Sequence, residues 1–121
     1  MSKKNAVIFD FNDTLRDKGS GKSNKKVLKK ALKDEKKEHV IVLSGESEGK
    51  KAGTEHWLKK HGLGKAELHV RPEHNTEPDY REKAHVLNTE ISKQFNVKKA
   101  YDDKSKNVKM FKKHGIKAKK V

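Results

Sequence analysis

The 121-residue sequence predicts an α/β fold in which helices cover both faces of a mostly parallel sheet of about five strands. Short apolar segments typical of buried strands alternate with longer segments whose apolar residues recur at helical spacing. Each strand-like segment is followed by polar side chains, and no internal repeat or linker interrupts the alternation. Strands joined through helices generally run parallel with right-handed crossovers. We therefore expect one domain, spanning residues 1–121.

The first half of the chain supplies three of these strands. Residues 6–9 form an apolar run that ends at Asp10, and residues 40–43 form another that ends at Ser44 and Gly45. Between them, Asn24 is suited to cap a helix whose buried side is Val27, Leu28, Ala31 and Leu32. Residues 50–61 then predict a helix burying Ala52, Trp57 and Leu58, and residues 68–70 a short strand ending at Arg71.

The second half repeats the pattern. From Asp79 to about Phe95 the apolar residues fall at helical intervals, and residues 97–101 predict a fourth strand followed by Asp102 and Asp103. A last helix carries Val108, Met110 and Phe111. Residues 116–121 alternate apolar and lysine side chains, which is typical of a protected edge strand.

Composition limits the class of protein. Only 31% of the residues are hydrophobic and 40% are charged, so the core must be thin. The sequence has no cysteine, which excludes disulfides and thiolate metal sites. Its first apolar run is too short for a signal peptide, and no run approaches the length that spans a membrane. We expect a soluble, cytoplasmic protein without membrane contact; the oligomeric state stays open.

The formal net charge of +14 has two interpretations. A basic surface attracts polyanions such as nucleic acid. However, only three of the 31 basic residues are arginines, and the lysines are spread over every predicted helix. This usage also fits a general bias of composition.

Polar residues follow four successive predicted strands: Asp10 and Asn12, then Ser44, then Arg71, then Asp102 and Asp103. Because the carboxyl ends of parallel strands meet at one edge of a sheet, these groups should lie close together. Carboxylate oxygens suit Mg²⁺, which proteins hold through one or two carboxylates together with a substrate phosphate. The sequence thus predicts a magnesium and phosphate site.

Two other features favour structural roles. The segment Gly19-Ser20-Gly21-Lys22-Ser23 is similar to the end of a phosphate-binding loop, but the full pattern needs a glycine where Arg16 stands. A flexible turn before a helix is the simpler interpretation. Trp57 lies beside Leu58 on a predicted helix, which favours a core position over a base-stacking role.

The motifs resemble those of the haloacid-dehalogenase (HAD) superfamily. Residues 9–15, Phe-Asp-Phe-Asn-Asp-Thr-Leu, are similar to its first motif, and residues 42–45 are similar to its second. Lys83 and the Asp102-Asp103 pair fall where the third and fourth motifs belong. The best match is to the 3′-phosphatase domain of phage-type polynucleotide kinase-phosphatases, through Ser44 to Ser47, Val70-Arg71, Thr76, Asp79, Lys83 and residues 100–103, continuing to Val108, Met110 and Gly115.

The resemblance implies a Rossmann-like three-layer sandwich and a Mg²⁺-dependent phosphatase. Asp10 would attack a phosphate monoester, Ser44 and Lys83 would hold phosphate oxygens, and Thr14, Gly45 and Arg71 would contact the substrate. Asp10, the backbone carbonyl of Asn12, and Asp102 or Asp103 would bind the metal. The implied substrate is a phosphorylated molecule, such as a polynucleotide 3′-phosphate or a nucleotide.

The sequence departs from the family pattern at three positions. Asn12 replaces an aspartate that protonates the leaving oxygen, Asp13 replaces a glycine, and Glu46 replaces an arginine common in the most similar members. Loss of a general acid typically costs about 10² to 10⁴ in rate. The sequence therefore leaves open a slow phosphatase, an enzyme for a better leaving group, or a domain that binds metal, phosphate or nucleic acid without turnover.

The intervals between the motifs hold about one helix plus loops, which leaves no room for the cap domain of many family members. We expect an uncapped, open site, which favours a macromolecular end over a small metabolite. An oligomeric partner could close the site in place of a cap.

Overall fold

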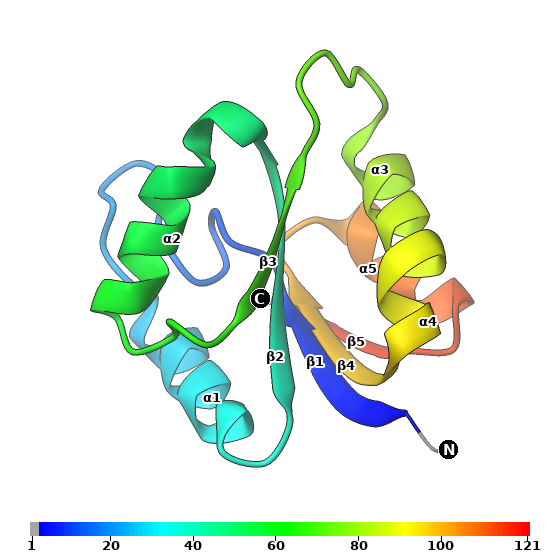
Figure 1. Ribbon diagram of the computed structural model, residues 1–121, viewed down its shortest axis with the longest axis horizontal. Coiled ribbons are helices and arrows are strands. Elements are labelled where there is room, and N and C mark those ends of the chain that lie inside the picture. Colours follow the sequence, from blue (N-terminus) through cyan, green and yellow to red (C-terminus); the bar gives the residue numbers. More distant parts are fainter. Residues whose placement is uncertain (1–2) are drawn as a thin grey trace.

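The structure, a computed structural model, describes residues 3–121 and contains one five-stranded parallel sheet in the order β3-β2-β1-β4-β5 (Figure 1). The strands are β1 (Lys4–Phe9), β2 (His39–Ser47), β3 (Glu67–Arg71), β4 (Phe95–Asp102) and β5 (Lys117–Lys120). Every neighbouring pair is parallel. The predicted α/β fold and the edge position of the last strand are therefore confirmed, and no cap domain is inserted within residues 3–121.

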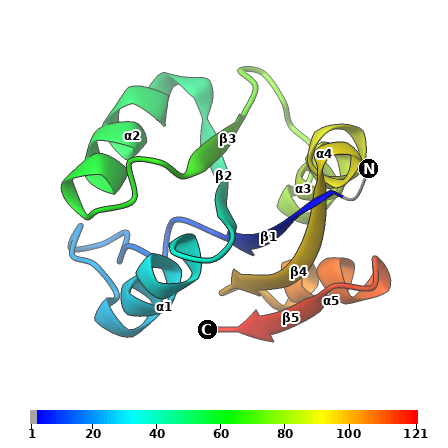
Figure 2. The ribbon, with the colours of Figure 1, turned by 60° about the horizontal axis from the view of Figure 1, so that its bottom comes forward.

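Helices form a layer on each side of the sheet (Figures 1 and 2). The first layer contains α1 (Lys25–Glu35) and α2 (Lys51–Lys60), which follows a short 3₁₀ turn, η1 (Glu48–Lys50). The second layer contains α3 (Asp79–Val86), the π-helical η2 (Leu87–Ile91), α4 (Ser92–Gln94) and α5 (Ser105–Lys113). This arrangement is the expected three-layer sandwich.

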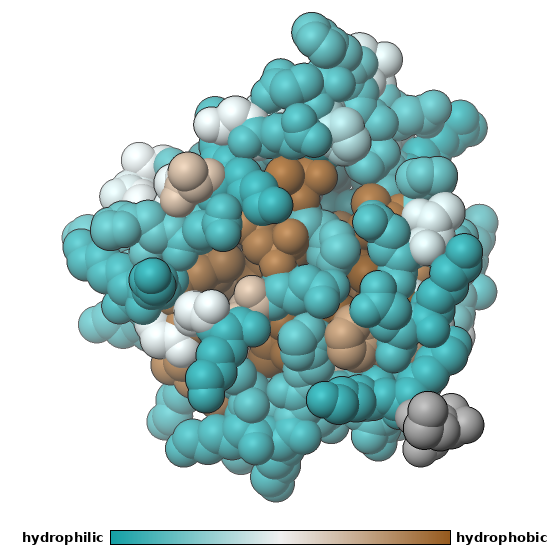
Figure 3. Space-filling model, viewed as in Figure 1, coloured by the Kyte–Doolittle hydropathy of each residue, from teal (hydrophilic) through white to brown (hydrophobic). Residues whose placement is uncertain are grey.

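The central strands read as continuous apolar runs because both of their faces are buried. In β1, Val7 and Phe9 pack into the core beneath α1 and α2, whereas Ala6 and Ile8 pack into the core beneath the second layer. Apolar side chains are scarce on the surface. The face drawn in Figure 3 is hydrophilic almost everywhere, with apolar side chains gathered near its middle.

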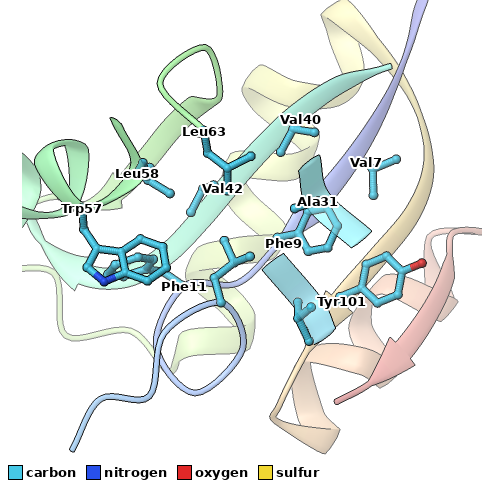
Figure 4. Packing of buried hydrophobic residues seen from close by; sticks show 12 residues of the cluster. Val7, Phe9, Phe11, Ala31, Val40, Val42, Trp57, Leu58, Leu63 and Tyr101 are labelled. Atoms are coloured by element: carbon cyan, nitrogen blue, oxygen red, sulfur yellow. The ribbon is translucent and has the colours of Figure 1, made fainter. Parts of the chain in front are cut away.

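Trp57 belongs to the core, as the sequence predicts. It is 9% exposed and meets the ring of Phe11 edge-on with centroids 5.2 Å apart (Figure 4). Its indole N–H donates to the carbonyl oxygen of Gly21 at 3.1 Å. That bond ties Gly21 to α2, while residues 19–22 are exposed, so the segment is a surface turn anchored at one point.

Three local predictions were wrong. Ala52 is exposed, and Thr54 takes the buried position on α2. Phe95 does not end the long helical segment but begins β4, where its ring stacks on His39 with centroids 4.6 Å apart. β2 extends beyond Leu43 to Ser47, because the pairing of β2 with β3 resumes there after an irregularity.

No helix within residues 3–121 has both the length and the apolar character needed to cross a membrane.

Candidate active site

Four strands bring the predicted site residues to one edge of the sheet. Asp10 directly follows β1, and its backbone N–H donates to the carbonyl oxygen of Tyr101 on β4 at 2.9 Å. Asp102 is the last residue of β4, Ser44 lies within β2, and Arg71 ends β3. The parallel sheet thus gathers side chains that are up to 92 positions apart, from Asp10 to Asp102.

Lys83 on α3 joins these carboxylates. Its ammonium Nζ lies 2.8 Å from Asp10 Oδ1, 2.9 Å from Asp102 Oδ2 and 3.5 Å from Asp79 Oδ2. The residue is only 1% exposed. A buried cation is strongly unfavourable unless opposite charges surround it, so the three carboxylates are what keeps an ionised lysine here.

Burial and the neighbouring charges together raise the pKa values of both Asp10 and Lys83. Burial raises the pKa of Asp10 to about 7; the Lys83 ammonium lowers it, and the Asp102 carboxylate raises it. Burial alone would lower the pKa of Lys83, but the neighbouring carboxylates of Asp10, Asp102 and Asp79 raise it above its usual range. The cluster therefore holds its lysine charged and makes Asp10 costly to ionise without a further cation.

Three carboxylates fit the implied metal. Asp10, Asp102 and Asp103 each offer an oxygen, and these oxygens all lie within 4.8 Å of one another. The Thr14 hydroxyl donates to Asp10 Oδ2 at 3.1 Å and lies 3.5 Å from Asp103 Oδ1. An all-oxygen set of this kind suits Mg²⁺.

An open pocket of about 490 Å³ lies beside this cluster. Asp10, Asn12, Gly45, Arg71 and Asp103, which the sequence singles out, line it. Thr14 and Ser44 are buried behind the pocket wall. Thr14 hydrogen-bonds to Asp10, and the Ser44 hydroxyl accepts the backbone N–H of Glu46 at 3.1 Å. Both hydroxyls thus support the site from beneath in this structure.

Asn12 is held by a polar network along the wall of the pocket. Its amide Nδ2 donates to Glu46 Oε1 at 2.6 Å, and its Oδ1 accepts from Arg16 Nη2 at 2.7 Å and from Arg16 Nε at 3.2 Å. The Thr54 hydroxyl donates to Glu46 Oε2 at 2.9 Å. Glu46 is therefore not a free negative charge facing the phosphate, because Arg16 at 3.4 Å partly neutralises it.

Asp13 adopts a left-handed backbone conformation with φ of 61°. This conformation favours glycine and, after it, asparagine and aspartate. The Asp13 carboxylate accepts the backbone N–H of Lys18 at 3.1 Å, which closes the loop that follows. Aspartate at a position where the resembling family has glycine is thus compatible with the same turn.

Several pocket residues could not be singled out from the sequence alone. Lys18, Lys50 and Lys104 line the pocket, but nothing distinguishes them from the other lysines of the chain. Asn107, 1% exposed, donates to Asp79 Oδ2 at 2.8 Å and to Asp102 Oδ2 at 3.0 Å. Asp79 stands in the family resemblance, and its helical spacing of four residues from Lys83 indicated that the two side chains could meet.

Asp79 should stabilise the fold only where its carboxylate is ionised. Burial acts to raise its pKa, but Lys83, the Asn107 amide and Arg71 together hold the pKa below the usual range. Its contribution is therefore complete above the unfolded-state pKa of about 3.9 and is lost as the pH falls through the lower folded-state pKa. We expect Asp79→Asn to lower the free energy of unfolding by about 1 to 3 kcal/mol at pH 7 in urea titrations.

The same substitution should have a smaller effect at pH 3 than at pH 7, because at pH 3 the carboxylate is largely protonated in the unfolded chain and part of its contribution to stability is lost. Glu55→Gln, at an exposed position on α2, is the matched control and should change stability by less than about 0.5 kcal/mol at either pH. An equal loss at both pH values would assign the effect to packing and contradict the role of the charge.

The parallel sheet, the carboxylates after β1 and β4, and the buried lysine between them are features of the HAD superfamily of phosphatases. More specifically, the family model described as the polynucleotide kinase PNKP phosphatase domain matches residues 2–121, so the chain belongs to that family. No protein among the curated sequences matches.

Solved structures share the fold. A chain in the structure of the Pnkp1/Rnl/Hen1 RNA repair complex superposes with a TM-score of 0.90 at 24% identity, covering 100% of this chain and 43% of that chain. A second structure of the Pnkp1/Rnl/Hen1 complex gives 0.89 at 24% identity, covering 100% and 47%. The core domain of a Streptococcus pneumoniae TIGR4 protein gives 0.52 at 18% identity, covering 98% and 79%. The present chain thus spans less than half the length of the two chains with the higher scores.

Proposed function

We propose that this protein is a Mg²⁺-dependent phosphatase that removes the 3′-phosphate of a polynucleotide through an aspartyl-phosphate. The observation that carries the proposal is the arrangement of Asp10 beside Asp102, Asp103 and the buried Lys83 at an open pocket. A carboxylate nucleophile needs nearby positive charge before it can approach a phosphate dianion.

The chemistry begins at the Asp10 carboxylate. One of its oxygens attacks the phosphorus atom, the new oxygen–phosphorus bond forms, and the bond from phosphorus to the 3′ oxygen breaks. Water then attacks the phosphorus atom of the aspartyl-phosphate and releases inorganic phosphate, which restores Asp10. The departing 3′ oxygen takes its proton from solvent in the open pocket, because the Asn12 amide has no acidic proton to give.

Asp10, Asp102, Asp103 and the backbone carbonyl of Asn12 would hold Mg²⁺. The bound cation would supply charge neutralisation for the phosphate and for the attacking carboxylate. Lys83 keeps Asp10 and Asp102 in place through its two short contacts. Arg71 is directed by Asp79 at 3.3 Å and by the carbonyl oxygen of Glu77 at 2.7 Å, and would orient the substrate phosphate.

The substrate class follows from access and charge. The pocket is uncovered within the described residues and is bordered by Lys18, Lys50 and Lys104 in addition to Arg71. The same pocket is lined by the carboxylates of Asp10, Asp13, Glu46, Asp79 and Asp103, so these cations together with a bound Mg²⁺ would hold the phosphorylated end of a polyanion. The rest of a long polyanion brings further binding energy from outside the pocket. The PNKP family and the RNA repair complexes with similar folds agree with a nucleic acid end as substrate.

A second candidate is a domain of the same fold that binds metal and a phosphorylated end without turnover. Asn12 favours it, because the side chain that stands in the general-acid position is an amide fixed at both ends by Glu46 and Arg16. The two candidates share a binding site and differ in whether phosphate is released.

We expect the protein to release inorganic phosphate from a single-stranded oligonucleotide that carries a 3′-phosphate when Mg²⁺ is present, and to lose this activity in EDTA. Phosphate release is measured directly, with an oligonucleotide that ends in a 3′-hydroxyl as the blank. Binding of the phosphorylated oligonucleotide without any release in Mg²⁺ would favour the second candidate and contradict the first.

A further inference from the structure

A lysine-lined groove lies away from the active-site pocket, between α1 and the end of β5. It encloses about 550 Å³ and has an apolar floor formed by Val27, Tyr101 and Val121. Its walls carry six lysines, which we call the lysine groove: Lys26, Lys29, Lys30, Lys33, Lys119 and Lys120. Figure 2 displays α1 and the C-terminal end of β5 on the same side of the molecule, with no further helix between them.

The positive charge of the groove is largely uncompensated. Lys30 pairs with Asp34 at 2.8 Å. Among residues 3–121, none of the other five lysines takes part in an ion pair within 4 Å, and no acidic residue lines the groove. Clustered cations without ion-pair partners give the groove a positive potential, which attracts an anionic ligand.

The lysines of the groove come from α1 and from the end of β5. On α1 they recur at intervals of three and four residues, which places them along one side of the helix over about 10 Å. Lys119 lies across from them on the edge strand β5, in register with Tyr101 of the groove floor, and Lys120 follows it with its side chain alternating to the other face of the strand. Two cationic walls with an apolar strip between them match a single nucleic acid strand, whose phosphates are anionic and whose bases have apolar faces.

The groove is connected to the active site through the loop that follows β1. Asp13 lines both the active-site pocket and a shallow depression on that loop, and Asn24 lines both this depression and the lysine groove. The three hollows are therefore consecutive on the surface. A strand with its terminal phosphate beside Asp10 would cross this depression, which is lined by Lys22, Ser20 and Ser23 as well as by the carboxylates of Asp13 and Asp17, to reach the groove.

We propose that the lysine groove binds the body of a single-stranded polynucleotide whose phosphorylated end occupies the pocket beside Asp10. The inference rests on the proposed function in taking a polynucleotide as the substrate. An acidic protein segment would satisfy the lysines as well, but it would not require a surface continuous with the pocket. The continuity and the apolar floor therefore favour the nucleic acid strand.

The test compares two triple variants that lose the same charge. Lys29→Gln/Lys33→Gln/Lys119→Gln alters exposed lysines of the groove, and the matched control, Lys109→Gln/Lys112→Gln/Lys113→Gln, alters exposed lysines of α5 on the opposite face of the sheet. Each variant has three positive charges fewer than the wild-type net charge of +14. Thermal unfolding of both variants verifies that the fold is intact.

Binding is measured by fluorescence anisotropy with a single-stranded RNA of about twelve nucleotides that ends in a 3′-hydroxyl, over a salt series in EDTA. We expect the groove variant to bind about tenfold or more weakly than the wild type and its salt slope to fall by about 2, which is roughly 0.7 for each of three lost phosphate contacts. The control variant should bind within about twofold of the wild type.

Equal weakening in the two variants would overturn the proposal, because it would reduce binding to a general effect of net charge. Tighter binding of polyglutamate than of RNA at the groove would overturn it in favour of an acidic protein partner. Release of phosphate by the wild-type protein from a small aryl phosphate tests the proposed function separately, since such a substrate does not reach the groove. Groove-dependent RNA binding without that release would support the groove while contradicting the phosphatase.

Discussion

Replacing Asp10 with asparagine should reduce phosphate release by about 10³-fold or more, because the amide cannot form the covalent bond to phosphorus. The substitution is nearly isosteric. The amide oxygen can still accept from Lys83, whose ammonium lies 2.8 Å from Asp10 Oδ1, and the amide NH₂ can donate to the Thr14 hydroxyl at the other oxygen. Initial rates with a 3′-phosphorylated oligonucleotide in Mg²⁺ measure the loss.

The fold and the binding of the oligonucleotide should survive this substitution. Lys83 keeps Asp102 at 2.9 Å and Asp79 at 3.5 Å, so the buried cation remains paired. Asp13→Asn is the matched control, because it removes a carboxylate from the same pocket rim at a left-handed position that asparagine tolerates. We expect the control to change the rate only a few-fold. Near-normal release by Asp10→Asn would exclude Asp10 as the nucleophile.

The sheet was readable from the sequence because the central strands are buried on both faces. The runs at residues 6–9 and 40–43 are continuously apolar, which is typical of strands buried on both faces. The polar residues that follow each run mark the carboxyl end of the strand. The residues that a parallel sheet collects at one edge follow from topology alone. Asp10, Asp102 and Asp103 could therefore be grouped before any contact was known.

Contacts between distant residues could not be foreseen where the order of the strands does not dictate them. Helical periodicity continues smoothly into Phe95, and only stacking on His39 and pairing with β1 place it in β4. Thr54 is as polar as its neighbours on α2, and its burial follows from the hydrogen bond to Glu46. In each case a tertiary partner outweighs the local pattern.

The candidate site likewise has features that the sequence predicts and features that only the structure shows. The resemblance pointed to Lys83, but its burial among three carboxylates is visible only in three dimensions. The sequence shows Glu46 only as a replacement for an arginine of the resembling family, whereas the structure pairs it with Arg16 and with the amide of Asn12. The two departures at positions 12 and 46 thus form one interacting unit, although they are 34 residues apart.

The contact between Asn12 and Glu46 leads to a second prediction with a large expected effect on the rate of phosphate release. We expect Asn12→Asp to raise the rate of phosphate release from a 3′-phosphorylated oligonucleotide by about 10² to 10⁴. The new carboxyl group would stand where the Asn12 amide now lies 2.6 Å from Glu46 Oε1. Two carboxyl groups at such a distance cannot both ionise readily, so one proton stays in the pair and is available to the leaving oxygen.

The gain should depend on the leaving group, which separates an added proton donor from a general improvement of the site. A 3′ alkoxide is a poor leaving group and needs the proton, whereas an aryl oxide leaves readily without one. We therefore expect Asn12→Asp to accelerate the oligonucleotide reaction strongly and aryl phosphate hydrolysis by less than about tenfold. Rates of both substrates are measured with the same preparations of wild type and variant.

Glu46→Gln provides the control for the pairing. In the Asn12→Asp background, Glu46→Gln removes the carboxylate that helps the carboxyl group at position 12 keep its proton. Arg16 remains, and its charge favours the ionised form of that carboxyl group. Part of the increase in the rate of phosphate release at neutral pH should therefore be lost. In the wild-type background the same substitution leaves an amide beside an amide and should change the rate little.

Equal acceleration of both substrates by Asn12→Asp would contradict the proton-donor explanation. Absence of release from either substrate, in wild type and variant alike, would instead identify the chain as a binding domain whose missing acid is not what limits it.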